Sequence, residues 1–196
     1  MSQDNGQSLS QKWHKKRAFW ARLALLSALM LSLSALEELF APLMPVGTKP
    51  GLANIPVMLV LAEYGLGAAL LLALFKAAFA LVTRGVIAFL MSLAGGLVST
   101  LLMWLLFRFA QKRVGLVAVS VLGALSHNMA QLLVATLLLG RYALYYAPVL
   151  ALLAIPCGAV TGVVLYAVLR LIERRVASLG QSGKNENENV YHTEEE

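Results

Sequence analysis

Long apolar stretches, separated by short polar breaks, constrain the fold of this chain more than any other feature of its sequence. They cover residues 18–41, 52–82, 86–108, 116–139 and 147–170. Hydrophobic residues make up 59% of the 196 residues and charged residues only 13%, whereas about a quarter of the residues of a soluble domain are charged. Because about 20 apolar residues cross a bilayer as a helix, the pattern predicts an all-α integral membrane protein.

The second apolar stretch, residues 52–82, is too long for one untilted span. The sequence Glu63-Tyr64-Gly65-Leu66-Gly67 in its middle is typical of a tight turn. We therefore expect a short helix at 52–64 and another at 66–83, which brings the total to six transmembrane helices. The expected organisation is a basic N-terminal tail at residues 1–17, a six-helix membrane domain at 18–171 and a disordered C-terminal tail at 172–196.

The lysines and arginines indicate the orientation of these helices. With six spans, twelve of the 16 basic residues fall on the side that holds both termini, and three fall on the other side. The positive-inside rule therefore predicts that both termini are cytoplasmic. The same distribution explains the net charge of +6 without nucleic-acid binding.

Polar side chains inside the predicted spans are few, and most of them lie in the outer half of the membrane. Such residues need a specific reason to be there, because burying polar groups in lipid is costly. The candidates for binding a small molecule from outside are Glu38, Lys49, Asn54, Lys76, Arg84, His127, Asn128 and Gln131. The basic members point weakly to an anionic or carbonyl-rich ligand.

The fifth predicted helix carries the clearest polar stripe, with small and polar residues at the spacing of one helix face. Two interpretations remain open: its side chains hydrogen-bond between helices, or they line a ligand pocket that opens outward. For Lys76 the alternatives to ligand binding are snorkelling of its ammonium group to the membrane interface or pairing with Glu38. For Arg84 the alternative is an anchoring role at the membrane interface. A metal site is not expected, because the spans hold one histidine. The stripe consists of Ser120, Ala124, His127, Gln131 and Ala135.

Strips of small residues occur on the first, fourth and sixth predicted helices. Gly158 and Gly162 form a GxxxG on the sixth helix, and Gly95 and Gly96 lie on the fourth. Small residues let helices approach closely. Each strip therefore predicts either packing inside the protein or a surface for a partner.

Several enzyme classes are excluded by residues that are rare in this chain. Asp4 is the only aspartate, so the aspartate pairs that hold magnesium on a diphosphate are missing. Cys157 is the only cysteine, which excludes an internal disulfide and a cysteine-cluster metal site. Glu37-Glu38 suggests an intramembrane protease, but the single intramembrane histidine argues against it. We expect no catalytic residues, no metal and no cofactor.

Three segments together resemble the Gx transporter family, historically labelled heptaprenyl diphosphate synthase component I, over about residues 20–170. The resemblance lies in the signature from Lys49 to Asn54, in the Ser-Leu-Ala-Gly-Gly of residues 92–96 and in the His-Asn-x-x-Gln of residues 127–131. Lys76 stands where we expect an arginine. The segments are GTKPGLANIPVML, FLMSLAGGLVSTLLMWLLFR and SVLGALSHNMAQLLVATLLLGRY.

Members of this family are similar to the substrate-binding S components of energy-coupling factor (ECF) transporters. The resemblance implies a six-helix bundle in a bacterial cytoplasmic (inner) membrane, with a pocket that opens outward and is capped by the loop after the first helix. It also implies a coupling membrane subunit and two ATPases that supply the energy, with the coupling subunit docking on small residues of the first helix, here Ala24 and Ala28. The chain has no GxxxxGK loop of its own. The alternative is a non-catalytic membrane partner of a prenyl diphosphate synthase.

Overall fold

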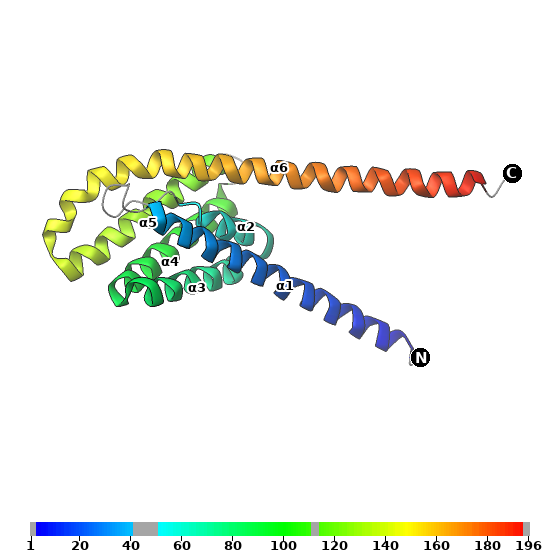
Figure 1. Ribbon diagram of the computed structural model, residues 1–196, viewed down its shortest axis with the longest axis horizontal. Helices are drawn as coiled ribbons and strands as arrows, with labels where there is room; N and C mark the ends of the chain where they lie inside the picture. The colour runs from blue at the N-terminus through cyan, green and yellow to red at the C-terminus, as the bar shows by residue number, and fades with distance from the viewer. Residues whose placement is uncertain (1–2, 41–50, 111–113, 194–196) are drawn as a thin grey trace.

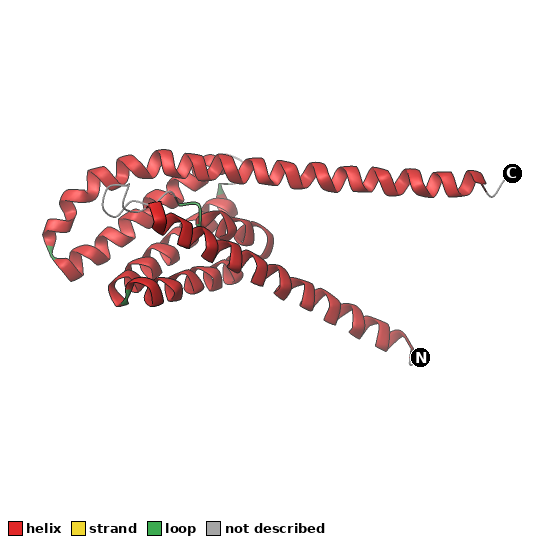
Figure 2. Ribbon diagram, in the orientation of Figure 1, coloured by secondary structure: helices red, strands yellow, loops and turns green. Residues whose placement is uncertain are grey.

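A computed structural model describes residues 3–40, 51–110 and 114–193, and all the regular structure in these residues is helical (Figure 2). Five of the helices are long and apolar enough to cross a membrane, and α2 is shorter. The prediction of an all-α six-helix bundle is confirmed. The elements are α1 (Gln3–Phe40), α2 (Asn54–Tyr64), α3 (Leu66–Arg84), α4 (Val86–Phe109), α5 (Leu116–Leu139), the 3-10 helix η2 (Arg141–Tyr146) and α6 (Ala147–Thr193).

Glycines in the left-handed backbone region separate several of these helices. Gly65 has φ 82° between α2 and α3, Gly85 has φ 85° between α3 and α4, and Gly140 has φ 93° after α5. Only glycine adopts such angles without a steric cost from Cβ. The predicted split of the second apolar stretch is therefore correct, and its physical cause is Gly65.

The short helix α2 lies in the middle of the bundle. Residues 55–61 are all buried, with no exposed face along that run. The N-terminus of α2 lies beside Glu37, since Ala53 N–H donates to the Glu37 carboxylate. Its C-terminal Tyr64 packs edge-on against Phe19, with ring centroids 5.0 Å apart. These two contacts show that α2 runs antiparallel to α1, and its burial makes it a core element of the bundle.

The longer helices pack around α2 in chain order, α3 on α4, α4 on α5 and α5 on α6 (Figure 1). Helix α2 contacts α1, α3, α4 and α6, whereas within the described residues α1 packs only against α2 and α3. The largest fully buried side chains include Met30, Met58, Leu72 and Leu165. Helix α1 therefore lies at the edge of the bundle and keeps an outer face.

Helices α1 and α6 both extend beyond the bundle, on the same side of it (Figure 1). Helix α6 continues to Thr193, which differs from the disordered tail expected from residue 172, and α1 begins at Gln3 within the expected N-terminal tail. The reason is that extending an existing helix costs far less than nucleating one. Pro156 lies inside α6, and the first third of that helix is visibly bent in Figure 1.

Candidate functional site

A cavity of about 140 Å³ lies between the helices, close to the C-terminal ends of α1 and α3. All six helices contribute to its wall, which makes it a property of the whole bundle. Its polar lining is unusual for a chain with so few charges. The lining side chains with polar groups are Ser34, Glu37, Glu38, Asn54, Lys76, Arg84, Ser92, His127, Asn128, Gln131 and Cys157.

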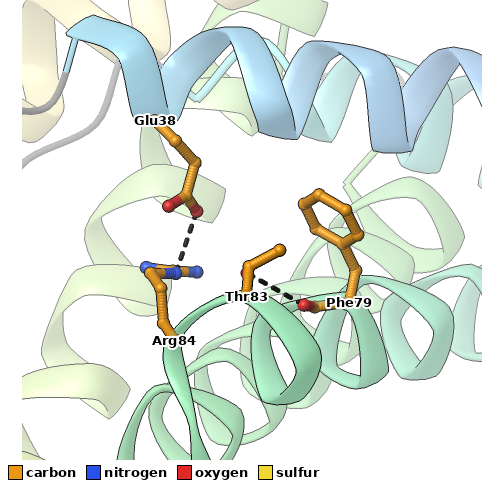
Figure 3. A network of polar contacts seen from close by, with 4 residues as sticks. All are labelled: Glu38, Phe79, Thr83 and Arg84. Atoms are coloured by element: carbon orange, nitrogen blue, oxygen red, sulfur yellow. Dashed lines mark hydrogen bonds and ion pairs between the residues drawn. The ribbon is translucent and has the colours of Figure 1, made fainter.

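Charged side chains from α1 and α3 meet at one side of the cavity. The Nε of Arg84 lies 2.9 Å from Oε1 of Glu38, and Figure 3 shows the two side chains pointing toward each other across the gap between their helices. They are 36% and 25% exposed, so this ion pair is partly solvated. Lys76 Nζ donates to Oδ1 of Asn54 at 2.8 Å, which joins α3 to the start of α2.

Glu37 lies on the buried face of α1 and is only 2% exposed. Its Oε1 accepts a hydrogen bond from the backbone N–H of Ala53 at 3.0 Å. The first N–H groups of a helix have no partner within the helix, and a carboxylate there also interacts favourably with the helix dipole. Glu37 therefore holds the N-terminus of α2 against the cavity.

His127 of α5 lies in a chain of hydrogen bonds in the opposite wall. Ser99 Oγ donates to the Gly96 carbonyl and lies 3.3 Å from Nδ1 of His127. Gln131 Nε2, which can only donate, lies 3.0 Å from Nε2 of His127. The His127 ring therefore contacts both Ser99 of α4 and Gln131 of its own helix.

Neighbouring contacts fix the rest of this wall. Asn128 Nδ2 donates to the Leu150 carbonyl at 3.3 Å, which links α5 to α6. A Cβ built on Gly95 of α4 would lie 2.9 Å from Cε1 of His127. Glycine at this position therefore gives the imidazole its space between α4 and α5.

The structure brings the described candidate residues together around one cavity. They come from four helices, and the fifth-helix stripe faces it through Ala124, His127 and Gln131. Lys49, the remaining candidate, and most of the expected capping loop lie outside the described residues. Tyr142, Tyr145 and Tyr146, which follow α5, are exposed and do not line the cavity. The candidates that line it are Glu38, Asn54, Lys76, Arg84, His127, Asn128 and Gln131.

Four polar lining residues were not among the candidates, namely Ser34, Glu37, Ser92 and Cys157. Glu37 precedes Glu38 in an apolar context, and sequence alone does not tell which of the two faces inward. Ser34 lies one helical turn before Glu37, and that spacing of three places both on one face. Cys157, the lone cysteine, is partly exposed and lines the cavity.

Two further expectations concern metal ligands and the proposed docking residues of α1. No group of three His, Cys, Asp or Glu side chains within residues 3–40, 51–110 and 114–193 could hold a metal ion. Ala24 and Ala28 are exposed on the outer face of α1.

Comparison with known proteins gives one match. The family described as heptaprenyl diphosphate synthase component I matches residues 26–168 of the chain. No curated protein matches the chain. No solved structure matches it either.

Proposed function

The chain belongs to the heptaprenyl diphosphate synthase component I family, and from this premise we propose that it is the substrate-binding membrane subunit of an ECF-type uptake transporter. In this proposal the chain lies in a bacterial cytoplasmic membrane with both termini inside, and it captures a small metabolite from outside. The observation that carries the proposal is the polar cavity to which all six helices contribute.

The lining of the cavity supports binding rather than packing alone. Hydrogen bonds between helices need only pairs of polar groups and require no open volume beside them. Here the groups that bond each other also border an open volume of about 140 Å³. A concave site with a few convergent polar groups is the usual form of a small-molecule site. The proposed ligand contacts are the described candidate residues, together with Lys49.

The outer face of α1 supports the proposed assembly with a coupling subunit and two ATPases. Within the described residues, this helix packs against α2 and α3 only, so its small residues Ala24 and Ala28 are open to a partner. Energy must come from such partners, because the sequence has no phosphate-binding loop of the GxxxxGK type.

The name of the family favours a second candidate function, a non-catalytic membrane partner of heptaprenyl diphosphate synthase. A catalytic role in prenyl transfer has little support, because magnesium diphosphate sites need several carboxylate ligands. The cavity has two glutamates, and one of them already binds the N-terminus of α2 while the other pairs with Arg84. Only the partner role remains as the alternative.

Co-purification distinguishes the two functions. We would isolate the tagged chain from its native membrane in mild detergent and identify the bound proteins by mass spectrometry. Recovery of a coupling membrane subunit with paired ATPases is the expected result. Recovery of a prenyl diphosphate synthase catalytic subunit alone would overturn the uptake proposal. A tagged, unrelated membrane protein from the same host controls for nonspecific recovery.

A further inference from the structure

A second groove, separate from the polar cavity, lies on the surface of α6. Its wall consists of Tyr166, Ala167, Arg170, Leu171 and Arg174. All five residues are exposed, so the groove is open to the surroundings of the protein. Its volume of about 490 Å³ is in the range typical of small-molecule sites.

The basic side of the groove consists of two arginines and a tyrosine. Tyr166, Arg170 and Arg174 follow at intervals of four residues, which places them on one side of the helix. The guanidinium carbon of Arg170 lies 5.2 Å from the centroid of the Tyr166 ring, a cation–π contact that holds this guanidinium in place. Glu173 lies between the arginines in sequence, but within residues 3–40, 51–110 and 114–193 neither arginine forms an ion pair with a carboxylate.

The length of α6 indicates where this groove would lie in a bilayer. The helix begins at Ala147, directly after three exposed tyrosines of a kind that is enriched at membrane interfaces. About 20 residues at 1.5 Å each cross the hydrocarbon core, which brings the opposite boundary close to Tyr166. The groove would therefore lie at the interface where α6 leaves the membrane. The three tyrosines are Tyr142, Tyr145 and Tyr146.

The exposed face that leads to the groove changes from apolar to basic along the helix. Val160 and Val163 are 55% and 56% exposed, and Ala167, Arg170 and Arg174 continue the same face at spacings of three and four. A phospholipid has the same order, with acyl chains in the core and its phosphate at the surface. Guanidinium groups bind phosphate oxygens in a bidentate manner, and anionic lipids attract basic residues at the membrane surface.

We propose that this groove binds an anionic phospholipid, whose phosphate contacts Arg170 and Arg174 and whose acyl chains lie along Val160 and Val163. Tyr166 is a positioning residue in this site, since it contacts the Arg170 guanidinium. The site is separate from the polar cavity, and the proposal holds whether or not the chain is a transporter subunit.

The first test measures lipid binding by native mass spectrometry. The full-length protein is purified in detergent, stripped of lipid and titrated with phosphatidylglycerol or with zwitterionic phosphatidylcholine. Wild type should bind phosphatidylglycerol more tightly, and the double variant Arg170→Gln, Arg174→Gln should weaken that binding roughly 10- to 30-fold. The matched control is Arg108→Gln, Arg175→Gln, which removes the same charge at exposed positions outside the groove. It should bind within about twofold of wild type.

The second test concerns Tyr166 and uses phosphatidylglycerol as the probe. Tyr166→Leu removes the ring below Arg170 and should weaken binding roughly two- to fivefold. Tyr166→Phe keeps the ring and should bind within about twofold of wild type. All the substituted residues are exposed, so the melting temperatures in detergent should stay near that of wild type.

Three outcomes would overturn the proposal. Equal affinity for the two lipids would show that the groove does not select anionic headgroups. Equal losses in the groove and control variants would show a general attraction by positive charge without a defined site. Unchanged lipid binding in the Arg170→Gln, Arg174→Gln variant, together with lost recovery of a protein partner, would assign the groove to protein docking. Each outcome leaves the co-purification test of the uptake function unaffected.

Discussion

At the scale of single residues, the His127–Gln131 pair shows how the cavity wall is organised. Both ring nitrogens of His127 have protein partners, Ser99 and Gln131. In the proposed site, the imidazole would act on a ligand through Gln131, which it contacts. The two residues are then expected to contribute to binding as one unit rather than independently.

We expect Gln131→Ala and His127→Ala each to lower the amount of small-molecule compound that the purified protein retains roughly two- to tenfold. The double variant should lose no more than Gln131→Ala alone, because coupled residues are not additive. Retained compound per protein, measured by mass spectrometry, tests this. Ser126→Ala is the control, since its hydroxyl bonds the Gly123 carbonyl on the same helix. Additive losses would show that His127 contacts the ligand independently.

Glu37 contributes to folding through the N-terminus of α2. We expect Glu37→Ala to lower the free energy of unfolding by about 1–3 kcal/mol, because the Ala53 N–H loses its acceptor in a buried site. Glu37→Gln keeps an acceptor oxygen and should cost less. The melting temperature in detergent measures both, with exposed Glu63→Ala as the control. Equal losses for Gln and Ala would mean that the negative charge, and not the acceptor, stabilises α2.

At the scale of elements, the small-residue strips of α4 and α6 are packing faces inside the protein. A Cβ on Gly158 would lie 2.7 Å from Cα of Val121, and one on Gly162 would lie 2.7 Å from Cα of Val117, both on α5. On α4, a Cβ on Gly96 would lie 3.3 Å from Cβ of Ala73. The alternative left open by the sequence, a partner surface, does not fit these contacts.

Gly158→Ala should therefore destabilise the bundle by about 1–3 kcal/mol, because the new methyl meets backbone of α5 that cannot rotate away. Gly67→Ala is the matched control. A Cβ there meets nothing within 4 Å, and replacing a helical glycine gains up to about 1 kcal/mol. Melting temperatures in detergent provide the comparison. A Gly158→Ala variant as stable as wild type would contradict close packing of α5 on α6.

At the scale of the whole molecule, α1 has two unlike sides. Leu23, Ser27, Met30, Ser34 and Glu37 are buried at spacings of three and four, which is the period of one helix face. Ala24 and Ala28 are exposed on another side. Helix α1 can therefore line the cavity and still present small residues to a partner.

We expect the double variant Ala24→Leu, Ala28→Leu to abolish recovery of the coupling subunit while its melting temperature stays near that of wild type. Two leucines on an exposed face disturb no contact within the bundle but block close approach of another helix. Ala167→Leu, on the exposed side of α6, controls for added apolar surface. Normal recovery from the double variant would show that the partner docks elsewhere.

The number of helices and the breaks between them are determined by the sequence itself, whereas the outer ends of α1 and α6 extend past the predicted bounds. Most apolar runs are long enough to cross a bilayer, and breaks fall at glycines such as Gly65 and Gly85, whose positive φ ends a helix locally. The polar candidates could also be found from the sequence, because polar residues inside apolar spans stand out without knowledge of their neighbours. These are local properties of the chain.

Only the tertiary structure decided which partner each polar group has and what each small residue faces. Glu37 and Glu38 are adjacent in sequence, yet one binds the N-terminus of α2 and the other pairs with Arg84. Ser27 and Ser34 share a face, yet only Ser27 is satisfied within its helix. Such differences depend on how each helix is rotated against neighbours far away in sequence. That rotation is set by side-chain packing across the whole bundle, which apolar periodicity within one helix does not encode.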